Sequence, residues 1–205
     1  MLYPRVARVG DIDMLVDDNQ MISYAEHLAR EHRIIRLNGV ITGEYAFHDF
    51  LLAMDSPGVN PNHDPIKMII TSPGGDLDSA FLLIDTMKHL LSPVITIGRY
   101  CASAACLILA SGKERYLYPH AKTMLHLATG QMGGDAKDWE IQHKQMMIYK
   151  NKIIDILTDS GVKRKRDDIL RDIDRDFWMD SEETINYGLA DEIMTSEKWS
   201  EFIGD

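Results

Sequence analysis

The segment from residue 66 to residue 91 constrains the fold more than any other part of the sequence. A short apolar run over 66–71 leads into Ser72-Pro73-Gly74-Gly75, and apolar residues then recur at steps of three and four. The first pattern predicts a buried strand and the last an amphipathic helix over 76–91, with a tight glycine turn between them. A strand, a turn and a helix in this order form the repeating unit of an α/β fold.

The same alternation continues along the chain. Further strands are expected at 33–37, 94–97, 115–117 and 123–127, and further helices at 103–110 and 135–161. The 103–110 helix is apolar on every side and must therefore be buried. The apolar residues of 135–161 lie on more than one face, so that helix is either buried or shared with another subunit. We expect one α/β domain over residues 1–205.

Two segments show no regular period. They are the first eighteen residues and the run Asn60-Pro61-Asn62-His63-Asp64-Pro65. Proline, asparagine and aspartate favour turns, and chain ends are often poorly ordered. We expect loops in both places, with a mobile arm as the alternative for the first.

Charge and composition exclude several classes of function. The formal net charge is −10, which disfavours a generic binder of nucleic acids or of anionic membranes. No apolar run approaches the roughly 18 residues of a membrane span, and no targeting segment is visible, so a cytoplasmic protein is expected. Cys101 and Cys106 lack the spacing of a zinc or redox motif and are expected to be buried, reduced thiols; no metal is expected.

Ser103 is the candidate nucleophile, because it lies among small residues at the start of the 103–110 helix. A serine hydroxyl needs an imidazole to take its proton and a carboxylate to orient that imidazole. His126 interrupts a strand-like apolar segment, although a histidine in that setting is more often simply a satisfied core residue. Asp176 precedes an aromatic pair that could bury it. Asp174 and Arg175, just before it, would by pattern form a surface ion pair worth about 0 to 1 kcal/mol.

Acyl transfer also needs backbone amides that face the developing oxyanion. Gly75 and Ala104 could supply them, because glycine adopts unusual backbone angles and the first amides of a helix are unpaired. The pattern therefore suggests a serine hydrolase, while Ser-Pro-Gly-Gly would also serve as an ordinary turn.

Taken together, these segments resemble ClpP, the family of proteolytic subunits of Clp proteases. The resemblance spans about residues 66–194 and rests on Ile69 to Gly75, Asp85-Thr86-Met87, Ala102-Ser103, Met124-Leu125-His126, Asp174-Arg175-Asp176 and Tyr187 to Asp191. It implies that Ser103 is the nucleophile, His126 the general base and Asp176 the orienting acid, with Gly75 and Ala104 as oxyanion donors.

The resemblance also implies an architecture and partners. Family members have a crotonase-like fold and stack two seven-membered rings around a chamber in which unfolded polypeptides are cut. Residues 128–161 would form the protruding handle between the rings, Asp174 and Arg175 would take part in ring contacts, and residues 1–20 would be an arm or axial loop. A Clp-type AAA+ unfoldase would be the partner that uses ATP, and this chain itself would need no cofactor.

The sequence also departs from the family pattern. Ser103-Ala104-Ala105 replaces the usual Ser-Met-Gly, one extra residue separates Gly98 from Ser103, and Ala128 replaces a proline. The first sixty-five residues match weakly, and the Asn60 to Pro65 connection looks inserted.

Three alternatives remain at this stage. The chain could be a phage-type relative that trims capsid or scaffold proteins, or a catalytically silent subunit of a mixed ring. It could also use the same fold for coenzyme A thioester chemistry. The complete serine, histidine and aspartate set argues against the last two.

Overall fold

The computed structural model describes residues 5–9, 12–16, 28–29, 31–43, 46–130 and 133–203. Its centre is a six-stranded sheet in the order β3-β4-β5-β6-β7, with β8 also paired to β6. The strands are β3 (Ile34–Asn38), β4 (Ile66–Ser72), β5 (Val94–Ala102), β6 (Arg115–Leu125), β7 (Phe177–Met179) and β8 (Glu192–Ile193). Strands β3 to β6 are parallel, and β7 runs antiparallel to β6. The expected α/β fold class is confirmed.

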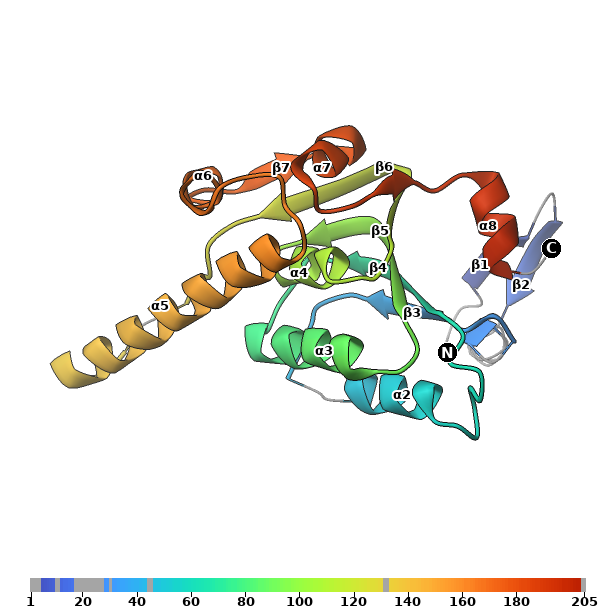
Figure 1. Cartoon of the computed structure of the whole chain (residues 1–205), viewed down its shortest axis with the longest axis horizontal. Coiled ribbons are helices and arrows are strands. Elements are labelled where there is room, and N and C mark those ends of the chain that lie inside the picture. The colour runs from blue at the N-terminus through green and yellow to red at the C-terminus, as the bar shows by residue number, and fades with distance from the viewer. Residues whose placement is uncertain are drawn as a thin grey trace.

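Helices cover both faces of this sheet (Figure 1). They are α2 (Ala46–Asp55), α3 (Leu77–His89), α4 (Ala104–Ala110), α5 (Ala136–Asp159), α6 (Arg166–Asp172), α7 (Ser181–Tyr187) and α8 (Ser196–Ile203). Alternate residues of β4 point to opposite faces: Met68 and Ile70 pack in the cluster that contains α3 and α4, whereas Ile69 packs in the cluster that contains Phe202 of α8. A strand buried on both faces explains the continuous apolar run in the sequence.

The nucleophile segment lies in the middle of the larger cluster. Every residue of α4 is buried, as an all-apolar helix requires, and α4 packs against β5, β6 and α3. The predicted strands at 115–117 and 123–127 are the two ends of one strand, β6. The helix that directly follows the nucleophile is thus fixed by the core.

Helix α5 has two unlike halves. Asp135 caps its start in a reciprocal box with Asp138, as the sequence predicted for the N-cap. Its C-terminal half buries Ile153 and Leu157 in the core, while Trp139, near its other end, is 56% exposed. Figure 1 shows the N-terminal half projecting from the body of the molecule. The apolar residues on several faces of the helix are therefore only partly explained by packing within one chain.

The two segments that lacked a period behave differently. Residues within the first eighteen, expected to be a loop or arm, form an antiparallel hairpin of β1 (Arg5–Val9) and β2 (Ile12–Val16). The expectation of a loop is wrong for these ranges, because strand pairing does not need an apolar period, whereas the alternative of an arm stays a prediction. The connection at 60–65 is a loop as expected, and Asn60, 1% exposed, organises it through its amide hydrogen bonds to Ser92 Oγ and the Asp64 carbonyl.

The two cysteines match the expectation of buried thiols. Both are free and fully buried, and the Cys106 thiol donates a hydrogen bond to the Cys101 carbonyl at 2.8 Å. Within the described residues, no helix has both the length and the apolar character needed to cross a membrane.

Candidate active site

Ser103 occupies a sharp turn between β5 and α4. Its backbone angles are φ 55° and ψ −126°, which an L-residue adopts only when its surroundings enforce them. The enforcement is visible, because Ser103 N donates to the Met124 carbonyl at 2.8 Å and the Ser103 carbonyl accepts from Cys106 N at 2.9 Å. A strand-to-helix turn of this kind presents a serine hydroxyl at the surface of the core.

His126 follows directly on the end of β6. Because β5 and β6 pair with Ala102 opposite Met124, the ends of the two strands lie side by side. His126 Nε2 lies 2.7 Å from Ser103 Oγ, which is hydrogen-bond distance for proton transfer between a nucleophile and its base. The imidazole side chain is 21% exposed. The structure thus brings together two residues separated by twenty-three positions in the chain.

Asp176 lies beside the same histidine, although less closely. It precedes β7, whose Phe177 pairs with Leu125 of β6, and its Oδ1 is 3.9 Å from His126 Nδ1. The carboxylate is 63% exposed, so the expected burial by the following aromatic pair does not occur. The physical reason is that β7 ends the path of the sheet, and Trp178 on it is itself 48% exposed.

Asp174 and Arg175 form an exposed pair within this chain. Arg175 Nη1 lies 3.2 Å from the Asp174 carboxylate and 2.6 Å from its carbonyl. The two side chains are 64% and 88% exposed. Within the single chain they match the surface ion pair that the sequence suggests, and they adjoin the candidate acid.

The glycine turn lies against the nucleophile. Gly75 has φ 148°, and a Cβ placed on it would lie 2.1 Å from the Ile41 carbonyl, so only glycine fits. Ile41 fixes the turn from both sides, since its N–H donates to the Gly74 carbonyl and its carbonyl accepts from Asp76 N. A Cβ on Gly74 would lie 2.9 Å from Ala104 N. The amides of 75 and 104 therefore come from two adjacent backbone segments beside Ser103.

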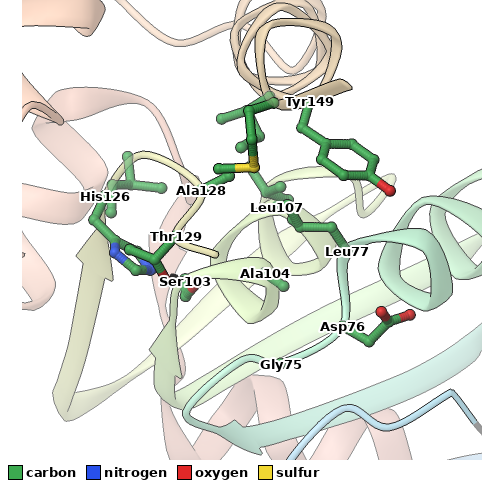
Figure 2. Close-up of a pocket in the computed structure, with 13 residues that line it drawn as sticks. Gly75, Asp76, Leu77, Ser103, Ala104, Leu107, His126, Ala128, Thr129 and Tyr149 are labelled. Carbon is green, nitrogen blue, oxygen red and sulfur yellow. Dashed lines mark hydrogen bonds between the residues drawn. The ribbon is translucent and has the colours of Figure 1, made fainter. Parts of the chain in front are cut away.

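A pocket of about 220 Å³ opens beside the serine and histidine (Figure 2). Its walls come from the glycine turn and the start of α3, from α4, from the segment after β6 and from α5. The lining residues are Gly75, Asp76, Leu77, Ser103, Ala104, Leu107, Leu125, His126, Ala128, Thr129, Met146, Tyr149 and Ile153. Sequence reasoning missed the contribution of α5. The spacing of Met146, Tyr149 and Ile153 places them on one helix face, but it does not indicate that this face meets the pocket.

Strand β5 has an irregular register shortly before the nucleophile. Against β4, strand β5 shifts register by one residue at Arg99: Gly98 pairs with Ile70, and Tyr100 pairs with Thr71. Against β6 the extra residues lie on β6, because Gly98 pairs with Leu117 and Tyr100 with Lys122. A bulge adds one residue to a strand without breaking the sheet. The bulge against β4 thus lies four residues before Ser103, within the segment where the sequence comparison with the family expects one extra residue.

The α/β fold and the hydrogen-bonded serine and histidine in a pocket place the molecule among the serine hydrolases. Comparison with known proteins narrows this class. The model of the Clp protease family matches residues 17–197. The chain belongs to the Clp protease family, and it is a peptidase.

Named relatives agree with this assignment. The chain is 32% identical over 177 residues to the ATP-dependent Clp protease proteolytic subunit 1 of Rhodopirellula baltica. The matched region covers 85% of this chain and 77% of that relative. It is 33% identical over 187 residues to the protein of the same name from Protochlamydia amoebophila. That matched region covers 87% of this chain and 88% of the relative. The family resemblance noted in the sequence is confirmed.

Proposed function

We propose that Ser103, His126 and Asp176 are the catalytic residues of a serine endopeptidase that cuts unfolded polypeptides. One observation carries the proposal: the 2.7 Å contact between His126 Nε2 and Ser103 Oγ at the edge of a pocket. The strained backbone at Ser103 adds support, because such strain clusters at functional sites.

The chemistry follows from the roles of these groups. Ser103 Oγ attacks the scissile carbonyl while His126 Nε2 takes its proton, and the imidazolium then protonates the leaving amine. The amides of Gly75 and Ala104 stabilise the oxyanion of the tetrahedral intermediate. Asp176 orients the imidazole through Nδ1, for which the carboxylate has to move about 1 Å closer; hydrogen bonds of this kind often tighten only when substrate binds.

We further propose that the active form is a barrel of two stacked heptameric rings. The projecting half of α5 carries Trp139 and Ile141, which are 56% and 68% exposed and would be covered by a facing subunit. Asp174 and Arg175 would exchange their internal contact for one across the rings, beside Asp176. A Clp-type AAA+ unfoldase would feed substrates and use the ATP, in line with the "ATP-dependent" names of both relatives.

The alternatives are not favoured. Both named relatives are proteolytic subunits of Clp proteases and neither is named as a capsid-processing enzyme. The contact between Ser103 and His126 also argues against a silent subunit.

The direct test of the catalytic set uses a fluorophosphonate probe. We expect the probe to label Ser103 in the purified wild-type chain and to leave Ser103→Ala unlabelled. Native mass spectrometry, with peptide hydrolysis measured on each species, would assign activity to an assembly state. Equal labelling of both proteins, or activity confined to a monomer, contradicts the corresponding part of the proposal.

A further inference from the structure

The pocket beside Ser103 has two ends of different character. Its walls combine polar groups with apolar side chains, among them Leu77, Leu107, Met146 and Ile153. Among the described residues, the ionisable groups that line it, apart from the candidate base His126, are Asp76 and the phenol of Tyr149. Figure 2 shows both at the end of the pocket remote from His126. A substrate side chain that enters past the serine would thus meet apolar groups first and a carboxylate last.

The position of Asp76 is fixed by the start of α3. It is the N-cap residue, and its Oδ1 accepts hydrogen bonds from Ser79 N at 2.8 Å and Ser79 Oγ at 2.6 Å. Both contacts use the same oxygen, so the second carboxylate oxygen keeps its capacity to accept from a ligand. A capping role and a ligand-binding role are therefore compatible in this one side chain.

A second carboxylate strengthens the negative character of this end. Tyr149 of α5 donates a hydrogen bond from its hydroxyl to Asp78 Oδ2 at 2.7 Å and so joins α5 to the first turn of α3. The hydrogen bond to Asp78, partial burial, and the charges of Asp78 and Asp76 raise the pKa of Tyr149. Lys152 lies close by, over the ring of Phe81, but does not line the pocket.

We propose that this pocket holds the substrate side chain on the amino side of the scissile bond, and that Asp76 makes it favour lysine or arginine over acidic residues. This inference rests on the proposed peptidase function of the same site. Lysine and arginine place their apolar stems against apolar walls while the charged head reaches a polar group, which is the arrangement that this pocket offers. A carboxylate on the substrate would instead face the carboxylate of Asp76.

The test compares three fluorogenic peptides that differ only in the residue before the cleaved bond: lysine, the uncharged norleucine, and glutamate. We expect the wild-type enzyme to cleave the lysine peptide at least tenfold faster than the glutamate peptide. In Asp76→Asn the ratio of kcat/KM for lysine to that for norleucine should fall about two- to fivefold, the scale of one partly exposed charge pair. Asparagine preserves the helix cap.

Matched controls separate charge from structure. Asp78→Asn removes the same charge next to the pocket, where the carboxylate is already engaged with Tyr149, and should change the ratio less than twofold. Asp76→Ser also keeps a capping side chain and should reproduce the effect of Asp76→Asn. Raising the ionic strength should lower the lysine preference of the wild type only.

The outcomes are distinguishable. If norleucine and lysine peptides are cleaved but their ratio is unchanged in both Asp76 variants, the inference is overturned while the peptidase assignment stands. If the wild type cleaves the lysine and glutamate peptides at equal rates, the inference is likewise overturned and the peptidase assignment stands. If the wild type cleaves none of the three and Ser103 is not labelled, the proposed function fails and the inference fails with it.

Discussion

The two halves of the candidate catalytic set differ sharply in how they are held. Ser103 and His126 sit at the ends of paired central strands, are 2.7 Å apart, and have the fully buried helix α4 behind them. Asp176 sits at the outer end of the sheet path, is 63% exposed, and lies 3.9 Å from the imidazole. The core fixes the nucleophile and the base, whereas the acid depends on a surface segment. In the proposed barrel, a subunit contact at Asp174 and Arg175 would therefore act on the catalytic set through the acid.

The largest expected loss of activity comes from substitutions of Ser103 and His126, the two residues that the core holds in place. Ser103→Ala and His126→Ala should each reduce peptide hydrolysis by about 10⁴-fold or more, because the two groups act as a unit. For the same reason the double variant should be no slower than either single one. Steady-state hydrolysis of one fluorogenic peptide by the three variants measures this. Multiplicative losses would show that the two residues act independently.

The exposed acid should matter less. We expect Asp176→Asn to lower kcat by about 10- to 100-fold, below the roughly 10⁴-fold loss typical of a buried triad aspartate, because a carboxylate at 3.9 Å in solvent orients the imidazole weakly. Glu182→Gln, which removes an exposed carboxylate of α7 outside the proposed ring contact, is the matched control. A loss as large as that of His126→Ala would break the comparison, since it would mean that Asp176 closes onto His126 in the working enzyme.

A further prediction concerns the anchor of the strand that carries His126. Arg115, at the start of β6, donates to the carbonyls of Ser160 and Gly188 at 2.7 and 2.9 Å and pairs with Asp191. Arg115→Met should lower the free energy of unfolding by about 2 kcal/mol, because it leaves partly buried acceptors unpaired. Urea denaturation at fixed protein concentration measures this. An unchanged midpoint would show that β6 does not need this anchor.

The same anchor predicts a pH dependence. Partial burial alone would raise the pKa of Asp191, but its bonds to Arg115 outweigh this and lower it. The pair therefore stabilises the fold above the unfolded-state pKa of about 3.9, and this contribution is lost as pH falls through the lower folded-state value. Asp191→Asn should cost about 1 kcal/mol at pH 7, a figure reduced for its exposure, and the gap to wild type should close in acid. A gap that widens below pH 4 would reverse the sign and contradict the assignment.

The smallest effect concerns the strain at Ser103. Glycine tolerates a positive φ and alanine does not, so inactive Ser103→Gly should be about 1 kcal/mol more stable than inactive Ser103→Ala. Thermal denaturation of the two proteins side by side gives the difference. Equal stabilities would show that the turn at Ser103 is not strained.

Local patterns predicted the central part of the fold well. The sequence indicates β4, the glycine turn and α3, and the capped start of α5, because each depends on neighbours along the chain. The sequence pattern predicts two strands where the structure has the single strand β6, because the residues from Tyr118 to Ala121, including Pro119, interrupt the apolar run. In the structure β6 continues through these residues, and its pairing with β5 passes from Leu117 to Lys122. The sequence did not predict helix α2 or the short helices α6, α7 and α8. A helix of two or three turns contains too few apolar residues to show a clear helical period.

The site was only partly predictable for a related reason. Ser103 and Gly75 stand out as local turn motifs, but their closeness to His126 depends on strand pairing. The loose position of Asp176 depends on where the sheet ends, and the contribution of Met146 and Tyr149 depends on how α5 crosses the pocket. No local pattern carries that information.

The burial of the two thiols has a practical consequence for following assembly. The sequence contains only Cys101 and Cys106, both fully buried, and burial raises the pKa of Cys106 to about 12 and that of Cys101 well above its usual range. Thiolates, the species that react with maleimides, are therefore scarce at neutral pH. A single cysteine introduced on the projecting half of α5 or beside Asp174 would take up a fluorophore selectively without removal of the native pair. Energy transfer between labelled chains could then report ring stacking and site closure in the same sample.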